Sequence, residues 1–82
     1  MVTVHRAHGL RFVIFTDDHE PAHVHVFGDG EAKIAIIGAD GFPELIYAIG
    51  LKANDRRGAM DVVAAYQSQF MMYWKEIHGS DI

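Results

Sequence analysis

Short segments with alternating side-chain character constrain the fold of this chain most strongly. Four of them occupy most of residues 2–37, and turn-forming stretches rich in glycine, aspartate or proline separate them. A period of two residues places successive side chains on opposite faces of a strand. Strands joined by short turns pair antiparallel. The pattern therefore predicts strands over residues 2–7, 10–16, 23–27 and 31–37, in a mostly antiparallel sheet.

Two details of this region concern turns and a further element. Gly28 and Gly30 flank Asp29 and indicate a hairpin, because glycine adopts positive φ at low cost. Residues 44–49, ELIYAI, fit either a fifth strand or one short helical turn, and the pattern does not separate the two.

The C-terminal third has the spacing of an amphipathic helix. Its apolar stripe consists of Met60, Val63, Tyr66, Phe70, Trp74 and Ile77. We expect Asn54 to cap this helix and Gly79 to end it. One helix of about 24 residues would run roughly 35 Å. The predicted fold class is α+β, with a four- to five-stranded, mostly antiparallel sheet packed by one face on one long C-terminal helix.

Size and composition restrict the function classes. A chain of 82 residues predicts one domain spanning residues 1–82. The net charge is −4 and the longest basic run is Arg56-Arg57, so we do not expect nucleic acid as a direct ligand. Without cysteine or a long apolar run, we expect a cytoplasmic protein with no membrane contact. Half of the residues are apolar, so we expect a protein partner or a homo-oligomer.

Residues 17–26, DDHEPAHVHV, concentrate side chains that can bind a metal. His23 and His25 share one face of a predicted strand, and the preceding turn supplies further ligands. Imidazole and carboxylate suit Zn or Mn, so a divalent metal is the candidate cofactor. The candidate metal ligands are His19, His23, His25, Asp17 and Asp18.

The same stretch has two other interpretations. In one, Pro21 sets a turn, and the two strand histidines form hydrogen bonds within the sheet or face solvent. In the other, it is a surface that binds a partner or ligand. The residues predicted for that surface are His19, Glu20, Pro21, His23, His25 and Lys33.

Four segments together resemble a family of small bacterial domains of unknown function. They read VTVHR, GLRFVIFT, DDHEPAHVHVFG and GEAKI, and the family hallmark is H-E-P-x-H-V-H-V followed by a glycine-rich turn and E-A-K. Its motif falls here on His19, Glu20, Pro21, His23, His25, Glu31 and Lys33. Ala22 replaces the second proline common in the family, which is expected to loosen the turn. The resemblance implies a component of a small two-gene operon with a toxin-antitoxin-like or regulatory role.

Two hypotheses about function follow. The first is a small binding or regulatory module, a component of a toxin-antitoxin-like pair by resemblance, that acts through protein contacts around the histidine turn. The second is a metal-dependent hydrolase or nuclease-like toxin in which Glu20 acts as general base on water. The residues alone leave open whether the protein is an enzyme.

Overall fold

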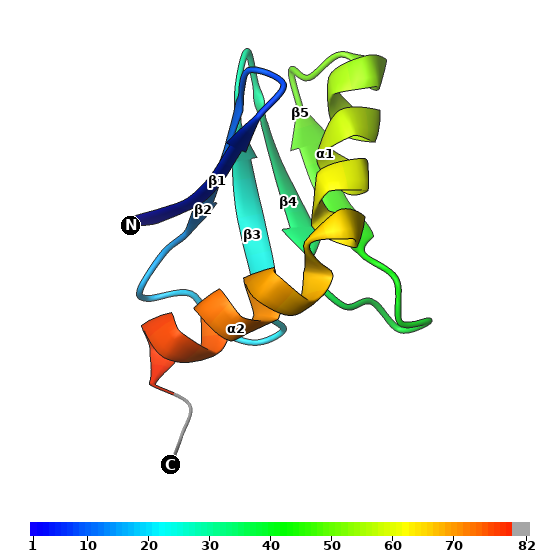
Figure 1. Ribbon diagram of the computed structural model, residues 1–82. Helices are drawn as coiled ribbons and strands as arrows, with labels where there is room; N and C mark the ends of the chain where they lie inside the picture. Colours follow the sequence, from blue (N-terminus) through cyan, green and yellow to red (C-terminus); the bar gives the residue numbers. More distant parts are fainter. Residues whose placement is uncertain (80–82) are drawn as a thin grey trace.

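A computed structural model describes residues 1–79 and shows one sheet with two helices packed against it (Figure 1). The strands are β1 (Val2–Ala7), β2 (Leu10–Ile14), β3 (His23–Phe27), β4 (Glu31–Ala35) and β5 (Glu44–Ile49). They lie in the order β1-β2-β3-β4-β5, and every neighbouring pair is antiparallel. The predicted α+β class and antiparallel sheet are confirmed, and residues 44–49 form a strand.

The strands β2 and β4 end two residues before the predicted positions, because loop contacts replace ladder pairing there. The N–H of Asp18 donates to the Phe15 carbonyl at 3.1 Å, which turns the chain just after β2. After β4, the N–H of Ile36 donates to the carbonyl of Ala22 at 3.0 Å. Ala22 is also buried, so the turn expected to be loose at this residue is tied to the end of β4.

The face of the sheet that contacts the helices forms the core, and we call it the inner face. Its buried strand residues include Phe12, Ile14, Val24, Val26 and Ile34. The helices add Val63, Phe70 and Trp74 to the same apolar cluster. Alternation along each strand then leaves the intervening residues on the opposite face, which we call the outer face.

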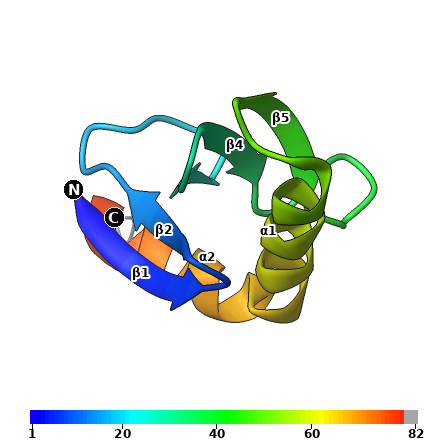
Figure 2. The same ribbon diagram turned by 90° about the horizontal axis from the view of Figure 1, so that it is seen from above.

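The prediction of one long helix is wrong, because two helices are present, α1 (Ala53–Ala65) and α2 (Gln67–His78). Between them Tyr66 has φ −112° and ψ 24°, and the two helices run in different directions (Figure 1). Helix α1 contacts β4 and β5, whereas α2 passes the end of the sheet where β3 begins (Figures 1 and 2). The bend therefore lets both halves of the apolar stripe reach a curved sheet.

The side chain of Gln67 stabilises the bend between α1 and α2. The side-chain amide of Gln67 donates to the carbonyls of Ile36 and Gly41, at 2.8 and 3.0 Å. Backbone bonds from Tyr66 to Val62 and from Phe70 to Tyr66 keep the helical spacing across the junction. The apolar stripe thus keeps one period through the bend. The sequence pattern therefore contains no sign of the bend.

The predicted start of the helical region differs from the structure, whereas its predicted end agrees with it. Lys52 is the N-cap residue and forms no side-chain capping bond, so the predicted cap at Asn54 is wrong. Gly79 ends α2 in the left-handed conformation, with φ 57°, as predicted. None of the described helices is long and apolar enough to cross a membrane.

The hairpin between β3 and β4 forms as predicted, but for a different reason. Neither Gly28 nor Gly30 has a positive φ. A Cβ atom on Gly28 would lie 2.6 Å from Leu10 Cδ2, and one on Gly30 would collide with the Ile49 carbonyl oxygen. Gly30 is therefore required for close approach of the neighbouring backbone, whereas a side chain at position 28 would displace the end of the Leu10 side chain.

Candidate metal centre

The histidines of β3 lie on the outer face of the sheet. Val24 and Val26 point into the core, so His23, His25 and Phe27 take the other side of the strand. The imidazole rings of His23 and His25 have centroids 5.0 Å apart. The predicted side-by-side arrangement of the two histidines is therefore confirmed.

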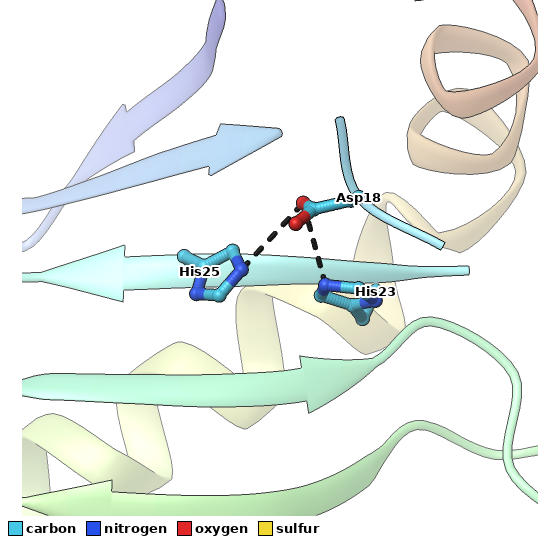
Figure 3. A group of neighbouring side chains, drawn as sticks. All are labelled: Asp18, His23 and His25. Carbon is cyan, nitrogen blue, oxygen red and sulfur yellow. Dashed lines mark ion pairs between the residues drawn. The ribbon is translucent and has the colours of Figure 1, made fainter. Parts of the chain in front are cut away.

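The loop between β2 and β3 brings Asp18 to the same place. Its Oδ2 atom accepts the Phe15 N–H at 3.1 Å, which fixes the direction of the carboxylate. That oxygen lies 3.3 Å from Nε2 of His23 and 3.5 Å from Nε2 of His25 (Figure 3). One carboxylate oxygen and two imidazole nitrogens thus converge, all within 4.8 Å of one another.

The hydrogen bonding of His23 determines which of its ring nitrogens carries a proton. Nδ1 lies 2.8 Å from the carbonyl oxygen of Pro21, which can only accept, so Nδ1 must donate. In the neutral ring, Nε2 then directs a lone pair at the Asp18 carboxylate. The His23 side chain is only 4 % exposed. Two hydrogen-bond acceptors therefore face each other unless a proton or a metal cation lies between them.

The environment of His25 favours a neutral ring. Burial lowers its pKa from 6.5, and the nearby His23 lowers it further, while Asp18 acts in the opposite direction. The Phe15 ring packs edge-on against His25 with centroids 4.8 Å apart. Nε2 of His25 is buried and makes no hydrogen bond with the described residues. When the ring proton is on Nδ1, this nitrogen offers a lone pair to a cation.

The donor set fits a divalent transition metal. Neutral imidazole and carboxylate are the usual nitrogen and oxygen ligands of zinc. A histidine that binds a metal commonly donates its other ring N–H to a backbone carbonyl, which fixes the ring. His23 and Pro21 already have this arrangement.

The other predicted ligands lie outside this group. Asp17 and His19 are exposed and do not join the three converging atoms. Glu20 accepts a hydrogen bond from Trp74 Nε1 at 3.1 Å, which ties the loop to α2. Of the five predicted metal ligands, the structure brings together Asp18, His23 and His25.

Two further residues of the predicted partner surface take different positions. Pro21 follows a cis peptide bond and orients His23 through its carbonyl. Lys33 is the register partner of His25 on the neighbouring strand β4. It therefore lies on the outer face beside the three converging side chains.

Sequence reasoning missed several residues around this group. The Trp74 ring packs against His23, with ring centroids 5.3 Å apart, although the two residues are 51 positions apart in the sequence. No local pattern connects these two residues. Tyr47, by contrast, pairs with Lys33 in register, and recognition of residues 44–49 as a strand would have placed it on the outer face.

Comparison with known proteins places the chain in a family. A family model described as a domain of unknown function, DUF4160, matches residues 9–75. No curated protein and no solved structure shows significant similarity to the chain. Because the matched residues span most of its length, the protein belongs to the DUF4160 family of domains of unknown function.

Proposed function

We propose that this protein binds a divalent transition metal, with zinc as first choice, through Asp18, His23 and His25. The observation that carries the proposal is the hydrogen bond of His23 Nδ1 to Pro21. In the neutral ring, it leaves the lone pair of Nε2 facing a carboxylate oxygen at 3.3 Å in a buried position. A bound cation would turn this repulsive contact between two acceptors into shared coordination.

The distances in the cluster support the proposal. Zinc bonds of about 2.0–2.1 Å in a tetrahedral site separate the ligand atoms by roughly 3.3 Å. The distances from Asp18 to His23 and His25 are 3.3 and 3.5 Å. The Asp18 oxygen thus lies at the spacing of zinc ligands from each imidazole, whereas the two imidazole nitrogens lie within 4.8 Å of each other and need roughly 3.3 Å when they share a metal.

The number of ligands suggests what the centre does. Structural zinc sites have four protein ligands, whereas catalytic sites have three and leave a position open. Among the described residues, the group contains three. When bound, such a metal acts as a Lewis acid on an oxygen-containing ligand. We therefore favour a centre that binds an exogenous ligand, and the hydrolase and nuclease-like toxin are narrower forms of this proposal.

The general base of such a reaction is a separate question. Glu20 is engaged with Trp74, and its side chain does not belong to the converging group. The proposal for the metal centre therefore does not depend on catalysis by Glu20.

Isothermal titration with zinc, combined with native mass spectrometry, tests the proposal. We expect one zinc ion per chain in the wild type and loss of stoichiometric binding in His23→Ala and His25→Ala. His19→Ala is the matched control, because His19 is exposed and lies outside the group. Circular dichroism checks that each variant folds. Equal zinc binding by the wild type and a folded His23→Ala variant would reject the site.

A second candidate function, contact with a protein partner, is favoured by β5. This strand lies at one end of the sheet. Apolar side chains on it and before it are exposed, namely Phe42 at 69 %, Ile46 at 45 % and Ile49 at 65 %. An edge strand with such residues can add a strand from another chain. A regulatory or toxin-antitoxin-like pairing is the finer form of this candidate.

Co-purification with the product of the neighbouring gene tests this second candidate. We expect Ile46→Lys to abolish a complex that the wild type forms, because a charge on the edge opposes strand addition. Met72→Lys is the control, since Met72 is exposed on α2 at 56 %. Complex formation unaffected by Ile46→Lys would exclude this edge as the contact surface.

A further inference from the structure

A row of side chains crosses the outer face of the sheet beside the proposed metal centre. His25 on β3 pairs with Lys33 on β4, and Lys33 pairs with Tyr47 on β5. Directly opposed residues in an antiparallel sheet have Cβ atoms about 4.5–5.5 Å apart. The Lys33 side chain therefore starts beside a proposed metal ligand, and its ammonium group is within reach of the centre.

A second row of side chains lies on the same face, two residues further along β3, and adds two more cations. Arg6 on β1 is paired with Arg11 on β2, and Arg11 is paired with Phe27 on β3. The Arg11 guanidinium carbon lies 5.6 Å from the centroid of the Phe27 ring. Like charges directly opposed across a sheet are destabilising. This arrangement therefore has a stability cost that an anionic ligand would offset.

Within residues 1–79, these cations have no anionic partner. Arg6, Arg11 and Lys33 form neither a hydrogen bond nor an ion pair with the described residues. The carboxylate in the second row, Glu31, accepts a hydrogen bond from the Tyr47 hydroxyl at 3.0 Å. In the described part of the chain, the three cations are therefore left without an ion pair, although the carboxylates of Glu31 and Asp18 lie on the same face.

The balance of charge beside the metal indicates the class of ligand. A divalent cation with one carboxylate ligand leaves one excess positive charge, and Lys33 beside His25 increases that excess, whereas Arg11 shares its row with Glu31. A dianion compensates this better than a monoanion does. Guanidinium and ammonium groups are also the usual partners of phosphate oxygens in proteins.

We infer that the exogenous ligand of this centre carries a phosphoryl group, an inference that rests on the proposed metal function. One phosphoryl oxygen occupies the open position beside Asp18, His23 and His25, and Lys33 contacts the others. Arg11, in the second row, attracts the anionic ligand over a longer distance. The ligand is a small phosphate, either inorganic phosphate or a phosphate monoester.

The test uses the full chain loaded with Co²⁺ in place of zinc, because the visible absorption of Co²⁺ changes when a ligand enters its coordination sphere. The probes are inorganic phosphate, phenyl phosphate and acetate. We expect both phosphates to change the spectrum saturably and at lower concentration than acetate does. Tighter binding of phenyl phosphate assigns a monoester as ligand, and tighter binding of inorganic phosphate assigns the free anion.

Substitution of Lys33 isolates its contribution. Lys33→Met is expected to weaken phosphate binding about tenfold or more, the loss typical for one charge-assisted hydrogen bond. Its affinity for Co²⁺ should stay within about twofold of wild type, since a factor of two is a small change in binding free energy. Lys52→Met is the matched control, because Lys52 is exposed and precedes α1. Arg11→Met should weaken phosphate binding less than Lys33→Met does.

The outcomes separate the two proposals. Failure of the wild type to bind Co²⁺ or zinc overturns the proposed metal function. Stoichiometric Co²⁺ binding without a phosphate-dependent spectral change overturns the phosphoryl inference and leaves the metal centre standing. Equal phosphate affinity in Lys33→Met and Lys52→Met removes Lys33 from the site. Equal phosphate binding with and without metal rejects coordination of the anion by the centre.

Discussion

Nε2 of the buried His23 lies 3.3 Å from Oδ2 of Asp18, in a geometry that leaves no ring proton between them when the imidazole is neutral. The contact needs a positively charged species. A proton would make it an ordinary ion pair, and a divalent metal would make it a coordination site. These two explanations predict different responses to substitution, metal and pH.

Asp18→Asn distinguishes the two. In the metal-free protein, Oδ2 of Asp18 makes the contacts with both the Phe15 N–H and His23, so the introduced asparagine replaces one of them: its oxygen accepts the Phe15 N–H, or its amide donates to His23. We expect the free energy of unfolding without metal to change by no more than about 1 kcal/mol.

Zinc should stabilise the wild type by about 2.7 kcal/mol at a concentration 100 times the dissociation constant. It should not stabilise Asp18→Asn in the same way, because the variant lacks the carboxylate ligand. Thermal unfolding with zinc and with a chelator measures both effects. An equal shift of Tm in both proteins would contradict a role for Asp18 in metal binding.

The pH dependence of the metal-free protein should reflect His25. Burial lowers the pKa of His25 below 6.5, against the opposing effect of Asp18 and with smaller lowering contributions from His23 and Lys33. The unfolded chain then binds a proton more readily than the folded protein does. Stability from this group is therefore complete above about pH 6.5 and is lost as the pH falls toward the folded pKa.

Chemical denaturation between pH 7.5 and pH 5 in the presence of a chelator checks this expectation. His25→Gln should lose less stability over that interval than the wild type does, because glutamine has no proton to bind. His19→Gln is a suitable control, since His19 is exposed. A steeper loss in His25→Gln than in the wild type would show that another group causes the dependence.

Gly58→Ala should stabilise α1. Gly58 lies inside the helix, and an added Cβ would meet the ring of His8 at 3.9 Å, an ordinary van der Waals distance. Alanine is preferred over glycine in a helix interior by up to about 1 kcal/mol. Urea denaturation should therefore show a higher midpoint for the variant with an unchanged slope.

Gly30→Ala should have the opposite effect. An added Cβ at this position would collide with the carbonyl of Ile49 and the backbone of Gly50. Relief of the collision requires β4 and β5 to move apart, so we expect destabilisation of about 1–3 kcal/mol. The same urea experiment measures it, and a midpoint equal to that of the wild type would mean that the hairpin adjusts freely.

Local patterns predicted the strands well, because a two-residue period reports directly on which side chains share a face. They placed His23 and His25 side by side, and Asp18 among the carboxylates able to join them. They did not separate Asp18 from Asp17, since the direction of a loop side chain depends on contacts such as the Phe15 N–H.

The helix break shows a second limit. Helical spacing continues through Tyr66, and the bend depends on Gln67 meeting carbonyls of a distant loop. The roles of Gly28 and Gly30 are similar, because their neighbours come from other strands. In each case the deciding contact joins residues that are far apart in the sequence, so a local pattern carries no information about it.

The hydrogen bond from Trp74 to Glu20 joins residues 54 positions apart. The indole ring also packs against His23, so α2 supports the loop that carries Asp18. During synthesis, Glu20 is added 54 residues before Trp74. The proposed centre can therefore take its final form only after translation has passed α2, so a nascent chain stopped before Trp74 would lack a fully assembled site.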